Sequence, residues 1–236
     1  MPWLEVARAL MPGGDVLTLR RRGAEFEIRC NLFELMSSRA SVSERALAHV
    51  ACARASRADS ASVFGALAPQ HEGRRAARIL IGGLGMGYTV RAVLDSVERD
   101  ARITVAELVP EVIEWNRGPL ADLAGRPLDD GRVTVYGGDV GDVIRANPRG
   151  FDAILMDVDN GPEAVLFPSN EGLYSVDGVR LMLSALAPGG VLGVWSADRS
   201  LSFETVLQTG GIAYERVDVN VRDNGPAHTI YLMRVR

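Results

Sequence analysis

The sequence contains no lysine: all 26 of its Lys and Arg residues are arginine. This absence excludes a Walker A phosphate-binding lysine and any mechanism that passes through a lysine Schiff base. A basic excess is missing too, because the formal net charge is −4, whereas nucleic-acid-binding domains are usually basic. Short arginine clusters at 20–22 and 74–78 are interpreted as a solvated turn and the lead-in to a strand. No nucleic-acid partner is therefore expected.

Cysteine is scarce. Cys30 and Cys52 are too few for a disulfide framework, and we expect both to be reduced and packed. No apolar run approaches the ~20 residues that cross a bilayer, and the first residues lack the basic region of a secretory signal. No pair among His49, His71 and His228 has metal-ligand spacing, so no metal site is predicted. The expectation is a cytoplasmic protein without membrane attachment.

The N-terminal part reads as a small extension. The segment "DVLTLRRRGAEFEIRC" at 15–30 alternates apolar and polar residues around a glycine-containing turn, which predicts a β-hairpin. A helix follows, opened by Ser41 and Glu44 at the spacing of a capping box. Residues 57–76 show no clear periodicity and are interpreted as a connection.

From residue 77 onward, strands and helices alternate. Apolar strands are predicted at 77–83, 101–108, 131–139, 151–159 and 191–198, with two more near 212–221 and 227–235. The pattern predicts an α/β fold with a doubly wound, mostly parallel seven-stranded sheet. We therefore divide the chain into an N-terminal hairpin and helix extension (1–76) and a Rossmann-like binding domain (77–236). In such folds the ligand lies at the carboxyl ends of the strands.

Four glycines stand where the first of these strands meets a helix: Gly82, Gly83, Gly85 and Gly87. Glycine permits a sharp turn and close approach to a ligand, although a tight turn without a ligand is an alternative. The dinucleotide fingerprint Gly-x-Gly-x-x-Gly fails, because the last position counted from Gly83 is Tyr88. The spacing Gly83-x-Gly85-x-Gly87 instead resembles the first motif of class I S-adenosylmethionine-dependent transferases.

Two carboxylates follow at the ends of the next strands. Glu107 lies twenty residues after Gly87, where a carboxylate can accept both ribose hydroxyls of a nucleoside. Asp139 lies where these transferases hold the adenine amino group, and it suits a helix N-cap equally well. A surface charge at the strand end is the alternative for Glu107. Leu108 and Val140, next to these carboxylates, are assigned to the same nucleoside site.

A more specific resemblance covers the chain from residue 78 onward. The segment "FDAILMDVDNGPEAVLFPSNEGLYSVDGVRLMLSALAPGGVLGVWSA" at 151–197 is similar to a block of the spermidine synthase (polyamine aminopropyltransferase) family. The resemblance implies that Asp157 lies at the donor site and helps deprotonate the attacking amine. That role is chemically sensible, because an alkylamine is protonated at neutral pH and cannot attack until a base removes the proton. Capping of a loop is the alternative for Asp157.

The sequence also departs from that family. Gly85 stands where the family's first motif has an aspartate, and Asn160 replaces a second aspartate. A glutamine and a Tyr-His-Glu cluster are absent, and "ELMSSRASVSERAL" occupies the equivalent stretch. Loss of an anion beside the donor's amino-acid tail makes room for a carboxylate. We therefore expect ordinary S-adenosylmethionine and methyl transfer to a small amine-bearing acceptor, with Asp157 as base or anchor and Asp159 and Asn160 shaping the pocket. Transfer of the carboxylated aminopropyl group is a less favoured variant.

Three other functions stay open. Aminopropyl transfer from decarboxylated S-adenosylmethionine to a diamine is supported by the retained Asp157. A non-catalytic nucleoside-binding protein is the next alternative. A nicotinamide-dependent oxidoreductase comes last, because the glycine spacing fails.

A few further residues are candidates for substrate binding. Glu34 and Arg39 belong to a polar group where a lid would meet the sheet, and Arg39 could bind a carboxylate bidentately. A hydrogen-bonded turn explains the same residues. Trp195, at the end of the fifth strand, could wall the acceptor site or simply be a core aromatic. A homodimer is expected, because the family often dimerises and the hairpin leaves an exposed edge.

Overall fold

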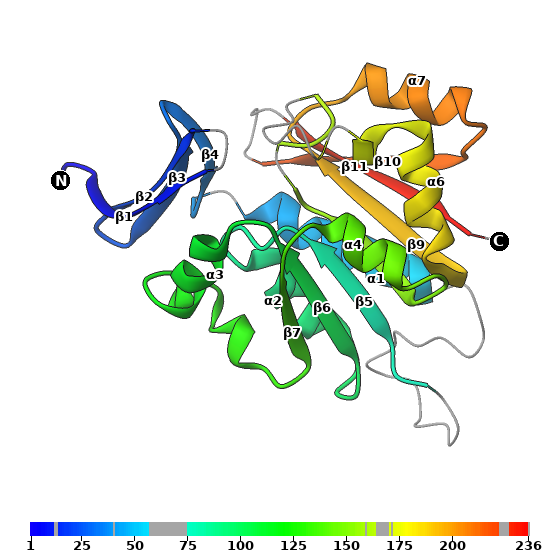
Figure 1. The fold of residues 1–236 in the computed structure, drawn as a ribbon, viewed down its shortest axis with the longest axis horizontal. Coiled ribbons are helices and arrows are strands. Elements are labelled where there is room, and N and C mark those ends of the chain that lie inside the picture. Colours follow the sequence, from blue (N-terminus) through cyan, green and yellow to red (C-terminus); the bar gives the residue numbers. More distant parts are fainter. Residues whose placement is uncertain are drawn as a thin grey trace.

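The structure, a computed structural model, describes residues 1–11, 14–39, 41–56, 75–158, 160–163, 170, 172–221 and 227–235. Its N-terminal part is a four-stranded antiparallel sheet in the order β1-β2-β3-β4 (Figure 1). The strands are β1 (Leu4–Leu10), β2 (Val16–Arg22), β3 (Glu25–Cys30) and β4 (Phe33–Ser37). The predicted hairpin is present as β2 and β3, and two further strands extend it on either side.

The larger sheet has seven strands in the order β10-β11-β9-β8-β5-β6-β7. They are β5 (Arg78–Gly82), β6 (Arg102–Glu107), β7 (Val133–Gly137), β8 (Phe151–Met156), β9 (Leu186–Ser196), β10 (Tyr214–Asn220) and β11 (Ala227–Arg234). Strands β5 to β9 pair in parallel, whereas β11 runs antiparallel to both β9 and β10. The predicted doubly wound, mostly parallel sheet is confirmed.

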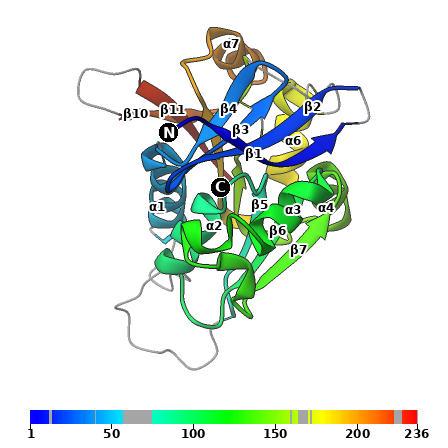
Figure 2. The same ribbon diagram turned by 90° about the vertical axis from the view of Figure 1, so that its left-hand side faces the viewer.

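Helices cover both faces of this sheet. They are α1 (Val42–Ser56), α2 (Tyr88–Ser96), α3 (Pro110–Arg117), α4 (Val140–Ala146), α6 (Val176–Ser184) and α7 (Leu201–Thr209), with short 3-10 turns η1 (Ala121–Ala124), η2 (Pro127–Asp129) and η3 (Gly172–Tyr174). One core packs α1, α2 and α3 on one face and the other packs α4, α6 and α7 on the opposite face (Figure 2). Side chains alternate along β5, so Ile79 and Ile81 enter the first core and Leu80 the second.

Helix α1 belongs physically to the larger layer. Although we grouped it with the N-terminal extension, it packs against α2, β8 and β9. Its residues Leu47 and Ala51 meet the position of Gly193 in β9, where an added Cβ would lie 3.0 Å from Leu47 and 3.5 Å from Ala51. The domain boundary at residue 76 stays a prediction.

The fifth predicted strand begins earlier than its sequence suggests. The sequence predicts this strand from residue 191, because Pro188 and the two glycines after it look like the end of a helix, but α6 ends at Ser184 and β9 starts at Leu186. Phe151 pairs with Leu186, and the register then shifts so that Ala153 pairs with Val191. The Pro-Gly-Gly segment therefore forms an irregularity inside the strand rather than a helix terminus.

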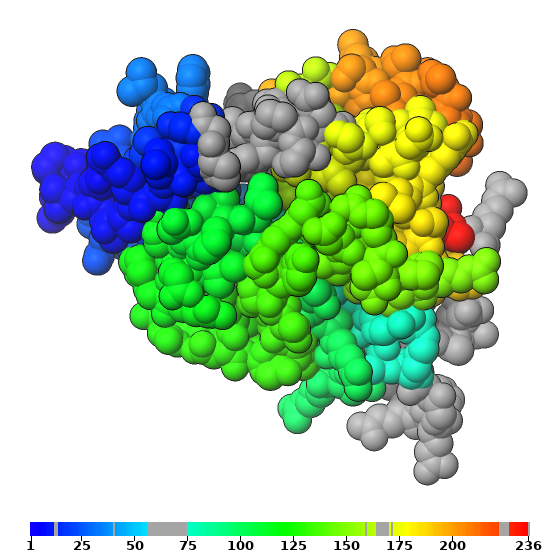
Figure 3. Space-filling view, viewed as in Figure 1, coloured from blue at the N-terminus to red at the C-terminus, as the bar shows by residue number. Residues whose placement is uncertain are grey.

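The four-stranded sheet lies at the edge of the α/β layer where the parallel strands end (Figure 1). In the space-filling view its residues pack directly against that layer (Figure 3). Residues of β2, β3 and β4 thereby reach the loops that follow β5, β6 and β8. None of the helices in the described part of the chain is long and apolar enough to cross a membrane.

Candidate functional site

A cavity of about 330 Å³ lies between the N-terminal sheet and the carboxyl ends of the parallel strands. Ten of the predicted site residues line it: Glu34, Gly83, Gly85, Glu107, Leu108, Asp139, Val140, Asp157, Asn160 and Trp195. Gly82, Gly87 and Arg39 are not among its lining residues, and Asp159 falls outside the described residues. The structure thus collects side chains from opposite ends of the sequence around one space.

The glycine cluster forms a tightly packed loop. Gly83 has φ +88°, and a Cβ there would lie 2.1 Å from the backbone oxygen of Asp157. The loop after β5 and the end of β8 can approach this closely only because Gly83 has no side chain. The Nδ2 of Asn116 donates a 2.8 Å hydrogen bond to the Gly85 carbonyl and ties the loop to α3.

Gly85 itself has φ +52° and faces the N-terminal sheet. A Cβ at this position would lie 3.2 Å from the Sδ of Met36, which belongs to β4. An apolar thioether therefore occupies the space beside Gly85, where the resembling family carries an aspartate. Sequence reasoning did not identify Met36, because a single methionine in a short strand gives no functional signal.

Glu107 holds the glycine loop in place through hydrogen bonds to the backbone. Its Oε2 accepts a 2.9 Å hydrogen bond from the Leu84 N–H, and its Oε1 accepts one of 2.9 Å from the Val109 N–H. The residue is only 8% exposed, so the alternative of a surface charge is wrong. Burial raises the pKa of Glu107, and these backbone donors oppose the rise. The N–H groups of Gly85 and Leu108 also interact with this carboxylate, so a ribose hydroxyl has to use the lone pairs that the backbone donors leave free.

Asp139 has the N-cap role that the sequence allowed. Its side chain accepts a 2.6 Å hydrogen bond from the Gly141 N–H at the start of α4. The same residue lines the cavity, so capping does not remove it from the site. Its contact with an adenine stays a prediction.

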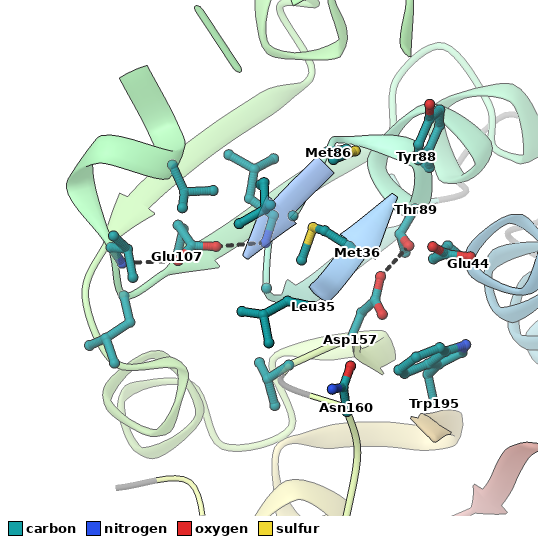
Figure 4. A pocket seen from close by; sticks show the side chains of 18 of the residues that line it. Leu35, Met36, Glu44, Met86, Tyr88, Thr89, Glu107, Asp157, Asn160 and Trp195 are labelled. Atoms are coloured by element: carbon teal, nitrogen blue, oxygen red, sulfur yellow. Dashed lines mark hydrogen bonds between the residues drawn. The ribbon is translucent and has the colours of Figure 1, made fainter. Parts of the chain in front are cut away.

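Asp157, at the end of β8, faces a second carboxylate. Its Oδ2 accepts a hydrogen bond from the Thr89 hydroxyl of α2 (Figure 4). Burial and the charge of Glu44 together raise the pKa of Asp157 to about 7, while the Thr89 hydrogen bond lowers it. An aspartate that titrates near neutral pH is placed to exchange protons, which is what the proposed base would need.

Glu44 is the main residue that sequence reasoning missed. The sequence assigned it to a helix capping box, but the structure turns its carboxylate into the cavity, toward Asp157 (Figure 4). Ser43 donates a 2.7 Å hydrogen bond to its Oε2, and burial raises the pKa of Glu44. Nothing in the local pattern distinguishes a first-turn glutamate that caps a helix from one that enters a site.

Of the weaker candidates, Trp195 lines the cavity and Arg39 does not. Arg39 points to Glu34 and Ser37, with contacts of 3.5 and 3.0 Å, so the structure agrees with the turn interpretation of this residue. Trp195 does line the cavity, and its ring packs edge-on against His228 with 5.0 Å between centroids. His228, from β11, was not assigned to the site from sequence.

The charges around the cavity have one sign. Five carboxyl side chains line it: Glu34, Glu44, Glu107, Asp139 and Asp157. Among the described lining residues there is no arginine, and His228 is the single basic side chain. Walls of this composition attract a cationic ligand and repel a carboxylate.

Comparison with known proteins finds relatives that match most of the chain. No family model matches the chain. It is 32% identical to the polyamine aminopropyltransferase of Mycobacterium tuberculosis over 167 residues, which is 70% of this chain and 29% of that protein. It is 30% identical to polyamine aminopropyltransferase 1 of Streptomyces coelicolor over 155 residues.

Over the matched residues the chain is similar to the polyamine aminopropyltransferases of the spermidine synthase-like family. It spans less than a third of the length of these curated relatives, with 28% of the Streptomyces protein covered. The spermidine synthase of Thermotoga maritima has the same fold, with a TM-score of 0.72 at 14% identity over 98% of this chain and 72% of that one. Human methyltransferase-like protein 13, solved in complex with SAH, gives a TM-score of 0.56 at 20% identity over 82% of each chain. The family resemblance stated from the sequence is thus confirmed.

Proposed function

We propose that the protein transfers an aminopropyl group from decarboxylated S-adenosylmethionine to an amine acceptor. The observation that carries this proposal is that the ionisable side chains lining the cavity are acidic, apart from His228. The decarboxylated donor is cationic and has no carboxylate, whereas the ordinary donor would bring a carboxylate against acidic walls. The curated relatives are named for aminopropyl transfer, which agrees with this preference. From the sequence, Gly85 favoured ordinary S-adenosylmethionine as the donor. The present proposal reverses that preference.

The nucleoside half of the donor would occupy the glycine-loop end of the cavity. Glu107 would accept the ribose hydroxyls with the lone pairs that its backbone donors leave free. Asp139 and Val140 at the start of α4 would meet the adenine. The sulfonium would then lie toward Asp157, where the carboxylates of Asp157 and Glu44 converge.

Asp157 and Glu44 would hold the acceptor amine. An alkylammonium ion has a pKa of about 10, so a base must take one proton before the nitrogen can attack. In this step an N–H bond of the ammonium breaks and an O–H bond forms on Asp157. The nitrogen lone pair then forms a bond to the propyl carbon, and the C–S bond breaks with its electron pair on sulfur, leaving methylthioadenosine. Thr89 fixes the orientation of the base.

Methyl transfer from ordinary S-adenosylmethionine is the second candidate. It is favoured by the uncharged contact between Gly85 and Met36, which leaves the loop without the acid that the resembling family carries there. A donor carboxylate beside this contact would meet a thioether rather than an anion. The two candidates share the acceptor site and differ in the donor. A homodimer and a cytoplasmic location stay predictions.

Calorimetric titration of the purified protein with each donor tests the proposal. We expect the decarboxylated donor to bind at least tenfold more tightly, a difference of about 1.4 kcal/mol. Asp157→Asn should weaken its binding, while Glu111→Gln, at an exposed position of α3, should not. Tighter binding of the ordinary donor would move methyl transfer to first place, and binding of neither would reject the nucleoside site.

A further inference from the structure

A buried serine joins the carboxylate pair to a histidine on another strand. Ser43 of α1 is completely buried. Its Oγ lies 2.7 Å from the Oε2 of Glu44 and 2.7 Å from the Nδ1 of His228. The three groups therefore form a continuous hydrogen-bonded chain from the cavity to β11.

A hydroxyl has one proton, so the direction of this chain depends on where the protons are. When Glu44 is ionised, Ser43 donates to Glu44, and His228 must donate to Ser43 through Nδ1–H. When Glu44 is protonated, it can donate to Ser43, and Ser43 then donates to a bare Nδ1. The same heavy-atom positions serve both arrangements.

We propose that Ser43 and His228 carry the acceptor's proton away from the Glu44–Asp157 pair. This inference rests on the proposed function for the source of the proton. Asp157 takes the proton from the ammonium and passes it to the facing Glu44, whose new O–H bond then breaks as an O–H bond to Ser43 forms. The former Ser43 O–H bond breaks as His228 gains an Nδ1–H bond. The imidazolium finally releases its Nε2 proton to water, which leaves both carboxylates ionised and His228 with its remaining proton on Nδ1. Before the next turnover the imidazole has to exchange this Nδ1 proton for one on Nε2, with water as the partner.

The surroundings of His228 suit a group that holds a proton only briefly. Burial lowers the pKa of His228, while the charge of Asp198, just after β9, raises it. The charged groups that bear on it are Asp198 and Glu44 of α1, which Ser43 links to it. The edge-on contact with Trp195 fixes the imidazole plane.

If Ser43 and His228 served only as a structural bridge that holds α1 against β11, they would show the same hydrogen bonds. The two roles differ in what they predict for the imidazole tautomer. A structural bridge keeps one tautomer, whereas a relay changes tautomer when the carboxylate pair gains or loses its proton. Nitrogen NMR of the imidazole distinguishes these two outcomes without any substrate.

The test uses the full chain labelled with ¹⁵N-histidine. As the pH rises and the Glu44–Asp157 pair loses its proton, the Nδ1 of His228 should change from an acceptor to an N–H donor. Ser43→Ala should abolish this change, and Glu44→Gln should leave one tautomer at every pH. Ser41→Ala, on the same helix start and outside the chain of hydrogen bonds, should behave as the wild type. A single tautomer throughout in the wild type, or a change that survives in Ser43→Ala, would overturn the relay.

A kinetic measurement follows once transfer is detected. His228→Asn keeps a polar atom near Ser43 but cannot take a proton, so kcat should fall at least tenfold while KM for the amine changes less than twofold. Added imidazole should restore part of the rate. An unchanged kcat would overturn the relay. If neither donor supports transfer, the proposed function fails, and the NMR result still decides the relay on its own.

Discussion

Glu44 and Asp157 meet at one end of the cavity, where the charge of Glu44 contributes to a pKa of about 7 for Asp157. The two residues come from the first turn of α1 and the end of β8. Two buried carboxyls that face one another resist simultaneous ionisation, so near neutral pH the pair tends to keep one proton. A cation placed between them would remove that resistance. The pair is therefore a source of instability in the empty protein, and in the proposed function it is the binding site for the amine.

The first prediction concerns stability against pH. Because the pKa of Asp157 is raised from 3.8 to about 7, its contribution to folding is fully present below pH 3.8 and is lost as the pH rises through 7. Relative to Asp157→Asn, the wild type should lose stability as the pH rises from about 4 to about 7 and stay at the lower value above that, a total loss of at most about 4 kcal/mol and less where water enters the cavity. Urea unfolding at pH 5 and pH 8.5 measures the difference. Asp100→Asn, on an exposed turn, is the control, and an equal difference at both pH values would contradict the assignment.

The second prediction concerns the turn after β5. In Gly83→Ala the new Cβ would collide with the Asp157 carbonyl, in addition to the strain of a φ of +88°. Gly211→Ala provides a matched control, because Gly211 has φ +65° and no atom within 4 Å of an added Cβ. The control should cost about 1 kcal/mol and Gly83→Ala at least about 3 kcal/mol in the free energy of unfolding. Thermal unfolding of the two variants measures this, and equal losses would show that the close approach is not maintained in solution.

The third prediction concerns Glu107. Glu107→Gln leaves one of the two backbone N–H groups, at Leu84 or Val109, facing an amide NH₂ instead of an oxygen. We expect a loss of about 1–3 kcal/mol in stability. The affinity for methylthioadenosine should also fall at least tenfold, because the ribose loses an acceptor. Calorimetry with Glu111→Gln as the control measures the affinity, and an unchanged value would remove Glu107 from the nucleoside site.

The fourth prediction concerns donor choice at Gly85. Aspartate tolerates the left-handed backbone better than most residues, but its Cβ would crowd the Sδ of Met36. The double variant Gly85→Asp, Met36→Ala relieves that contact and adds an anion beside the loop. It should raise the preference for the decarboxylated donor at least tenfold over that of Met36→Ala alone. A preference that does not move in competition binding would place the donor tail elsewhere in the cavity.

The parts of the fold that sequence predicted best are those with strong local signals. Ile79, Leu80 and Ile81 form a continuous apolar run, which is typical of a parallel strand buried on both faces, and β5 is such a strand. The start of β9 was misplaced because Pro188 and the adjacent glycines look like a helix stop. The strand starts at Leu186 because this residue pairs with Phe151, and the sequence alone does not reveal that pairing.

The site was predictable where one motif carries it and not where tertiary packing assembles it. Gly83, Glu107 and Asp157 each lie near the carboxyl end of a predicted strand, so the rule for strand carboxyl ends brings them together. Glu44 and Met36 enter the cavity only because α1 and β4 dock against that edge of the sheet. Glu44 also had a sufficient local explanation as a capping residue, and that explanation hid its second role.

The identity of the nucleoside product tests the account most directly. The protein is incubated with both donors and a panel of mono- and diamines, and the products are identified by mass spectrometry. We predict methylthioadenosine together with an acceptor that has gained an aminopropyl group, formed only from the decarboxylated donor and lost in Asp157→Asn. S-adenosylhomocysteine with a methylated acceptor would contradict the account and establish methyl transfer instead.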